Sequence, residues 1–336
     1  MEVSLWIEWV IKSLFIILLL TGGFAYTTLY ERRVLARMQV RIGPNRAGPF
    51  GLLQPVADGI KLIFKEELIP EKADKLIFIL APVITVIPAL IITAVVPWGE
   101  SVWLFGREIK LYLADLDVGV LYLMAVTSIS VYGITLAGWS SNNKYATLGG
   151  LRATAQMISY ELAMGFAMLG PVLMAGSMRM IDIVNAQRSM WFILPQAIAF
   201  LIYLATSLAE INRAPFDMPE AEQELTAGYH TEYSGMKFAL FFMAEYIKMI
   251  AISMIGSSLF LGGYHWPLPA HWLGGFAGPI NLFGKTVIWM FFIIWVRATL
   301  PRIRYDKLMQ LGWKVLFPLA LLNVAVTAAV IVLVGG

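Results

Sequence analysis

Acidic residues gather at one predicted membrane boundary, where their chemistry would be the binding and release of protons. They are Glu210, Asp217, Glu220, Glu222, Glu224 and Glu232, followed by Glu245 inside the next apolar run. The chain is otherwise 59% hydrophobic and 14% charged, and an ionised carboxylate without a partner is costly in apolar surroundings. Burial and neighbouring carboxylates both favour the protonated form, so such groups can exchange protons near neutral pH. Glu161, in an earlier apolar run, is expected at a depth similar to that of Glu245.

Structural roles could account for part of this pattern. Glu245 lies three residues before Lys248, so the two could form a neutralised ion pair on one helix face. Asp217 and Glu220 match a helix N-cap and its reciprocal partner, with Pro219 in the first turn. Capping does not account for the acids later in the loop, which form either a functional acidic surface or a solvated charged loop.

A basic stretch could donate hydrogen bonds near the same boundary. Five arginines lie within the 15 residues from Arg32 to Arg46. This composition is typical of a topology anchor that binds anionic lipid headgroups. Arg32 and Arg41 could instead donate to a protein interface or to the oxygen atoms of a ligand. The Gly-Pro-Asn run at 43–45, within this stretch, is a turn signal without phosphate-loop spacing, so no nucleotide site is expected.

Residues 52–65 show an amphipathic pattern that predicts a helix lying flat at the membrane surface. At 100° per residue, a narrow polar arc lies opposite an apolar face. The polar arc holds Gln54, Asp58, Lys61 and Lys65, and the apolar face holds Leu52, Val56, Ile60 and Ile63.

Eight apolar runs are long enough to position these residues as membrane-spanning helices. They lie at about 11–30, 76–97, 118–138, 155–176, 190–210, 237–261, 282–299 and 314–334. The expected fold class is an all-α polytopic membrane protein with about eight transmembrane helices and a cytoplasmic-side amphipathic surface helix. No internal repeat or low-complexity linker is found, which favours a single helical bundle over residues 1–336.

The distribution of Lys and Arg predicts the orientation of this bundle. Of the 25 such residues, 18 fall in one set of loops and flanks, which the positive-inside rule places in the cytoplasm. The first cytoplasmic loop would then be 31–75 and the acidic loop 210–236, with both termini periplasmic.

Residue types also limit redox chemistry. The chain has no Cys, which excludes disulfides, thiolate chemistry and Cys-bound zinc or iron–sulfur clusters. Its three histidines, His230, His265 and His271, fall in predicted loops, away from the middle of a span where paired haem ligands would lie. We therefore expect no metal, haem or flavin bound by this chain, and no redox centre in it.

In two long motifs the chain resembles the quinone-site (H-type) membrane subunit of respiratory complex I, NADH:quinone oxidoreductase. The motifs are ERRVLARMQVRIGPNRAGPFGLLQPVADGIKLIFKE at 31–66 and EINRAPFDMPEAEQELTAGYHTEYSGMKFALFFMAEY at 210–246. Similarity continues through GWSSNNKY at 138–145, SYE at 159–161 and RATLPRIRYDKLM at 297–309.

This resemblance implies a subunit of a proton-translocating enzyme in the bacterial cytoplasmic (inner) membrane. Such a subunit anchors the hydrophilic redox arm, forms part of the quinone-binding chamber and couples quinone reduction to proton translocation. The implied substrate is a quinone, either ubiquinone or menaquinone. The implied partners are membrane lipids and other complex I subunits, including the one with the terminal iron–sulfur cluster, its quinone-site neighbour and small membrane subunits next to the antiporter-like subunits.

Individual residues match positions of the family motifs. Those implied at the quinone passage are Arg32, Arg41, Asp58 and Lys61, with Arg213 and Asp217 in the loop that rearranges near the site. Those implied in the acidic proton path are Glu161, Glu210, Glu220, Glu222, Glu224, Glu232 and Glu245. Where some relatives have a glutamate in the third span, this chain has Ser128, so a bound water or Glu161 itself would have to bridge that step.

Three alternatives remain open from the sequence. A membrane-bound hydrogenase or a deazaflavin-linked dehydrogenase uses a related subunit with another electron donor. An autonomous ion transporter would use Glu245 and Lys248 as substrate ligands, although the missing repeats count against it. A purely structural subunit would only anchor the redox arm.

Overall fold

The structure of the chain is a computed structural model that describes residues 2–104, 107–218, 227–267 and 274–335. Helices account for nearly all of its regular structure. In chain order the elements are α1 (Glu2–Met38), η1 (Pro49–Gly51), α2 (Gln54–Ile63), α3 (Lys75–Ile91), η2 (Ile92–Val95), β1 (Ser101–Leu104), β2 (Arg107–Lys110), α4 (Gly119–Ser140), α5 (Lys144–Ala175), α6 (Met180–Ala186), α7 (Ala197–Glu210), η3 (Gly228–His230), α9 (Gly235–Phe260), η4 (Gly274–Phe276), α11 (Ala277–Thr299), α12 (Tyr305–Gln310), η5 (Leu311–Leu316) and α13 (Phe317–Gly335).

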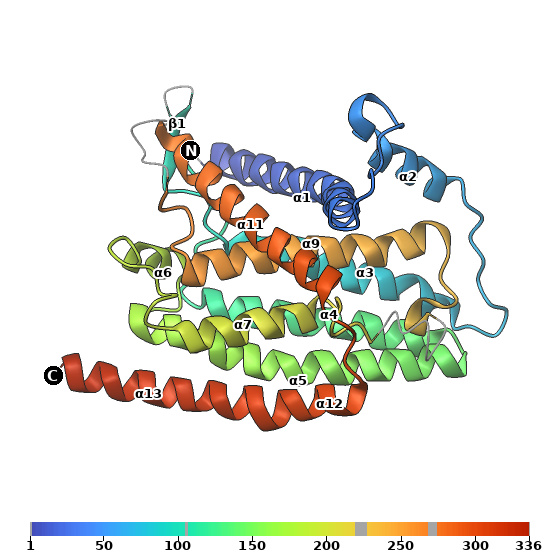
Figure 1. Cartoon of the computed structure of the whole chain (residues 1–336). Coiled ribbons are helices and arrows are strands. Elements are labelled where there is room, and N and C mark those ends of the chain that lie inside the picture. Colours follow the sequence, from blue (N-terminus) through green and yellow to red (C-terminus); the bar gives the residue numbers. More distant parts are fainter. Residues whose placement is uncertain (1, 105–106, 219–226, 268–273, 336) are drawn as a thin grey trace.

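The long helices run roughly side by side in one bundle (Figure 1). Helix α9 lies inside it and packs against α1, α3 and α11. Helices α1 and α13 lie at opposite outer sides (Figure 1), and their exposed surfaces are apolar, as expected for contact with lipid or with other membrane helices. Both chain ends lie at the same end of the bundle (Figure 1).

Seven helices in the described part of the chain are long and apolar enough to cross a membrane. The all-α membrane class is thereby confirmed. The predicted fifth span differs, because helix α7 begins only at Ala197 and its 14 residues rise about 21 Å. The preceding non-helical backbone is held by polar contacts: Phe192 N donates to Gln187 Oε1 at 3.2 Å, and Ile193 N donates to Phe260 O at 3.0 Å. Irregular backbone at membrane depth is tolerated where protein groups satisfy it in this way.

Two helix boundaries depart from the sequence expectation. Helix α1 continues to Met38, so the first residues of the predicted 31–75 loop are its last two turns. The sequence has no Gly or Pro between Gly23 and Gly43 that would stop the helix earlier. The amphipathic helix α2 spans 54–63, inside the expected 52–65, and begins with Pro55 in its first turn. Its apolar side chains, including Val56 and Ile60, stay about half exposed.

Small residues allow the antiparallel helices α4 and α5 to lie close together. The Cα of Gly150 would lie only 3.1 Å from a Cβ added to Gly138, so a larger side chain at either position would force the helices apart. Asn143 caps the start of α5: its side chain accepts from Tyr145 N at 2.9 Å. This tight hairpin places Ser128 of α4 next to Glu161 of α5.

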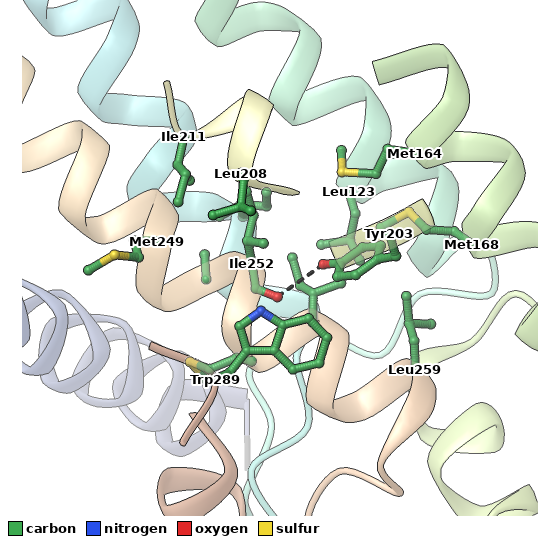
Figure 2. Close-up of a cluster of buried hydrophobic side chains, with 14 of the residues drawn as sticks. Leu123, Met164, Met168, Tyr203, Leu208, Ile211, Met249, Ile252, Leu259 and Trp289 are labelled. Carbon is green, nitrogen blue, oxygen red and sulfur yellow. Dashed lines mark hydrogen bonds between the residues drawn. The ribbon is translucent and has the colours of Figure 1, made fainter. Parts of the chain in front are cut away.

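An apolar core fills the bundle beside the polar region. Figure 2 shows Tyr203, Leu123, Met164 and Trp289 within it. The Tyr203 hydroxyl donates to Ile252 O at 3.0 Å, so this buried polar group is satisfied. After Lys248, helix α9 carries no further ionisable residue to its end. The buried charged residues of α9, Glu245 and Lys248, therefore lie near the middle of the helix.

Candidate functional site

Glu245, on the third turn of α9, is buried between two partners. Its Oε2 lies 3.6 Å from Arg213 Nη2, and its Oε1 accepts a hydrogen bond from the Tyr229 hydroxyl at 3.3 Å. The Arg213 guanidinium also lies over the ring of Tyr246, 4.5 Å from its centroid. Glu245 therefore belongs to a pair that joins α9 to the loop after α7.

Lys248 pairs with Glu210 and not with Glu245. The distance from its Nζ to Glu210 Oε1 is 3.5 Å, and both side chains are buried. Neither Glu210 oxygen has a hydrogen-bond partner among the described residues, so Lys248 provides its main charge compensation. Lys248 therefore does not form the i,i+3 ion pair with Glu245 that its spacing in the sequence allows. Its side chain points toward the end of α7 instead.

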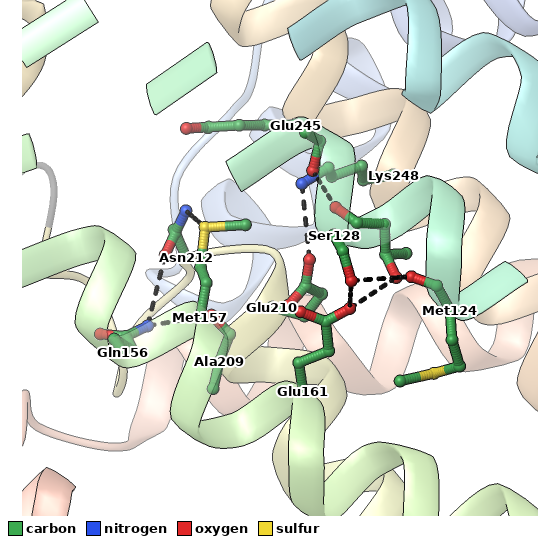
Figure 3. A network of polar contacts seen from close by, with 12 residues as sticks. Met124, Ser128, Gln156, Met157, Glu161, Ala209, Glu210, Asn212, Glu245 and Lys248 are labelled. Atoms are coloured by element: carbon green, nitrogen blue, oxygen red, sulfur yellow. Dashed lines mark hydrogen bonds and ion pairs between the residues drawn. The ribbon is translucent and has the colours of Figure 1, made fainter. Parts of the chain in front are cut away.

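Glu161 on α5 is held by hydroxyl groups from α4. Thr127 Oγ1 donates to its Oε1 at 3.2 Å, and Ser128 Oγ donates to the same oxygen in a short hydrogen bond. Figure 3 shows Ser128 between Glu161 and the backbone of Met124, to which it also bonds. The Ser128 hydroxyl therefore contacts Glu161 directly.

These groups form one polar cluster inside the bundle (Figure 3). Glu245 and Lys248 lie on one side of it, Glu210 in the middle and Glu161 on the far side (Figure 3). Their side chains come from three helices, α5, α7 and α9. Buried acids and a buried ammonium group in contact can change protonation together, since the charge of each affects the others.

The acidic loop is described only in part. Glu220, Glu222 and Glu224 lie outside the described residues. Glu232 is half-buried and accepts from Asn143 Nδ2 at 2.6 Å, so it contacts the α4–α5 turn and not the buried cluster. The Asp217 carbonyl oxygen accepts a short hydrogen bond from Arg302. Asp217 is thereby tied to the segment before α12.

His230 lies buried at the end of the acidic loop. Its ring packs against Tyr229, Phe238, Phe241 and Phe242. Burial, with the nearby Arg213 guanidinium adding to it, lowers the pKa of His230 to about 3. This histidine is therefore neutral at physiological pH. The sequence predicts only its loop position and gives no sign of its burial.

Four of the six residues implied at the quinone passage lie apart from the buried cluster, on or next to α1 and α2. Arg32 Nη1 pairs with Asp58 Oδ2 at 2.6 Å and joins the end of α1 to α2. Asp58 also accepts from Gln54 Nε2 at 3.1 Å. Arg41 contacts Gln39 at 2.7 Å, and Lys61 lies on the exposed side of α2. Arg213 is the residue of this group that reaches the buried carboxylates.

One ion pair is not evident from the sequence. Glu31 is 3% exposed and forms a short contact with Arg297 of α11. Both residues fall in basic flanking segments of the sequence. Their juxtaposition depends on how α1 and α11 pack, which local spacing does not reveal. Within the described parts of the chain, no group of three His, Asp or Glu residues could hold a metal ion.

The fold and this cluster define a class: a polytopic helical membrane protein with charged pairs between its spans. Comparison with known proteins gives the family. A family model described as NADH dehydrogenase matches residues 11–328. The chain is 54% identical over 309 residues to an H-type subunit of NADH-quinone oxidoreductase from Geobacter metallireducens, and the match covers 92% of each chain.

Two other relatives agree with this result. Identity to the NADH-quinone oxidoreductase H-type subunit of Protochlamydia amoebophila is 53% over 306 residues, covering 90% of this chain and 91% of the relative. Identity to the corresponding subunit of Thermomicrobium roseum is 51% over 323 residues, covering 93% and 92%. The chain belongs to the NADH dehydrogenase family, among the H-type subunits of NADH-quinone oxidoreductase.

The resemblance seen in the sequence is thereby confirmed. The chain is a membrane subunit of an enzyme complex, complex I, and other subunits of that complex are its partners. It is a multi-pass protein of the bacterial inner membrane. These matches favour complex I over the related hydrogenase and over an autonomous transporter.

Proposed function

We propose that this chain forms part of the quinone-binding chamber and couples quinone reduction to proton movement through its buried carboxylates. The observation that supports this most directly is the series of buried ionisable groups that begins at Arg213 and Glu245 and continues through Lys248 and Glu210 to Glu161. Intramembrane ionisable residues are expensive and usually have a function.

The proposed coupling is electrostatic. A negatively charged or newly protonated quinone species near the loop after α7 changes the field at Arg213. Because Arg213 lies 3.6 Å from Glu245, that change alters the affinity of Glu245 for a proton. Glu210 and Glu161 then respond in turn, since neighbouring carboxylates titrate together.

The acids of the loop after α7 have a place in the same proposal. Glu220, Glu222 and Glu224, which lie outside the described residues, stand at the start of the path. Glu232 has a place beside it, at the α4–α5 turn. Both termini face the periplasm in this orientation, which places the acidic loop on the cytoplasmic side.

The charged residues near α2 have a different proposed role. Arg32, Arg41, Asp58 and Lys61 line the quinone passage in this proposal, with the exposed apolar face of α2 at its lipid side. Arg213 and Asp217 lie at its inner end. The quinone, ubiquinone or menaquinone, is the substrate, and neighbouring subunits, including the one with the terminal iron–sulfur cluster, complete the chamber.

The test is quinone-driven proton pumping in the assembled complex. We expect Glu161→Gln and Glu210→Gln to reduce the protons moved per electron, because the amide keeps the shape of the side chain but cannot take up or release a proton. Glu108→Gln, at an exposed hairpin position, is the matched control and should pump normally. Unchanged pumping in both buried variants, in complexes shown to be fully assembled, would reject the proposed path.

A further inference from the structure

The side-chain amide of Gln156 binds both ends of the turn that follows α7. Gln156 lies on α5 and is fully buried. Its Nε2 donates to Ala209 O at 2.9 Å and to Phe216 O at 2.7 Å, and it lies 3.3 Å from Asn212 Oδ1. Figure 3 shows this amide facing Asn212 and Ala209. Since carbonyl oxygens only accept hydrogen bonds, the NH₂ group must face the turn.

The turn itself fixes the backbone of Arg213. Asn212 has a φ of +50°, which breaks the helix at this point. The Arg213 N donates to Leu208 O at 3.3 Å, and its carbonyl accepts from Phe216 N at 2.9 Å. Gln156 therefore holds the residues on both sides of Arg213 and determines where its side chain starts.

The Arg213 guanidinium depends on this placement for its contacts. It lies 3.6 Å from Glu245 and stacks on Tyr246, and these partners belong to α9, a different helix from the one that carries Gln156. The 3.6 Å separation is longer than an ideal charge-assisted hydrogen bond, so the pair does not lock its own geometry. The interaction energy between Arg213 and Glu245 therefore changes with small movements of the turn.

We infer that Gln156 is the positioning residue of the Arg213–Glu245 pair. Through this pair it affects the proton path, and that part of the inference rests on the proposed function. A space-filling role does not explain the residue type. Gln156 Oε1 has no hydrogen-bond partner among the described residues, and an unsatisfied buried polar atom is costly. An apolar side chain of the same length would fill the space without that cost, whereas the NH₂ group is needed for the turn.

Two substitutions that keep the size of the Gln156 side chain distinguish the positioning role from a space-filling role. Gln156→Met removes the donor, and Gln156→Glu replaces it with an oxygen that faces the acceptors of the turn. We expect both to lower the rate of quinone-driven proton pumping on the order of tenfold, as for contacting residues that are coupled, with the larger loss in Gln156→Glu. The control is Gln187→Met, because Gln187 is equally buried but bonds to α6 and Ser258 O, away from the path.

A double variant and a structure of a variant complex test whether Gln156 acts through Arg213 and Glu245. If Gln156 acts through Arg213 and Glu245, adding Gln156→Met to Glu245→Gln causes no further loss of pumping, while independent roles give additive losses. A structure of the assembled Gln156→Met complex, or of Gln156→Glu if the first does not assemble, should show Arg213 displaced from Glu245. Arg213 still in place would overturn the inference. Displacement with normal pumping would support the positioning role and count against the proposed function instead.

Discussion

Glu210 and Lys248 face each other between α7 and α9, with 3.5 Å between Oε1 and Nζ and side-chain exposures of 1% and 6%. Removing one partner of such a pair leaves a buried charge without compensation, which costs about 3–5 kcal/mol. Removing both charges together avoids that penalty. The effect of this pair on protein stability can therefore be measured separately from its effect on proton movement.

We expect Lys248→Met to lower the thermal inactivation midpoint of the assembled complex, because Glu210 is left buried without its cation. The double variant Lys248→Met with Glu210→Gln should recover most of that midpoint. Pumping should stay low in the double variant, because the amide cannot take up or release a proton. A double variant less stable than Lys248→Met alone would contradict the pairing.

Lys285 provides the control for this prediction. It is buried in α11, but its ammonium donates to the carbonyl oxygens of Leu261 at 2.6 Å and Gly263 at 2.8 Å. It thereby satisfies the backbone after α9, away from the Glu210–Lys248 pair. Lys285→Met should lower stability while the protons pumped per electron stay unchanged.

The Ser128 hydroxyl gives a second prediction, since it bonds directly to Glu161. Ser128→Ala removes one of two donors to Oε1. We expect the carboxyl band of Glu161 in infrared difference spectra of quinone reduction to shift, because its frequency depends on hydrogen bonding. Ser128→Thr keeps the hydroxyl and should preserve the band. The control is Ser130→Ala, whose hydroxyl bonds to Thr127 O at 2.7 Å. An unshifted band in Ser128→Ala would show that the contact does not matter.

Much of this site could be predicted from residue types and apolar runs. An acid in an apolar run, such as Glu161 or Glu245, is expected to face the bundle interior, because lipid cannot solvate it. The ends of helices can be predicted from the positions of Gly and Pro, which interrupt helices. Even so, the sequence prediction ends the first helix too early. The basic composition after Glu31 suggests a loop, but charged residues at a helix end are compatible with the helix when no Gly or Pro interrupts it.

The choice of partners could not be predicted in the same way. Sequence spacing makes Glu245 the obvious partner of Lys248, while packing brings Glu210 to it. The contact of Glu31 with Arg297 and that of Gln156 with the turn after α7 also join segments far apart in the chain. Such contacts depend on the relative shift and rotation of packed helices, which single-helix periodicity does not specify.

The buried His230 side chain makes the stability of the fold depend on pH. Burial, and secondarily Arg213, lowers its pKa to about 3 in the folded protein, against 6.5 as the ordinary value. Between these values the unfolded chain binds a proton that the folded chain does not. Stability is therefore lost as pH falls below about 6.5, by up to about 1.4 kcal/mol per pH unit from this group. Above about pH 6.5 His230 contributes no pH dependence.

His230→Phe should reduce that loss, because the phenyl ring fits the aromatic surroundings of Phe238 and Phe241 and cannot take up a proton. The measurement is the thermal inactivation midpoint of the assembled complex at about pH 7.5 and about pH 5.5, on either side of the ordinary histidine pKa, for the native protein and the variant. The acidic groups titrate in both proteins, so the difference between the two pH effects isolates His230. We expect a smaller fall in the variant. Equal falls would mean that His230 binds its proton in the folded complex as well, and that the neutral imidazole inferred from its burial is wrong.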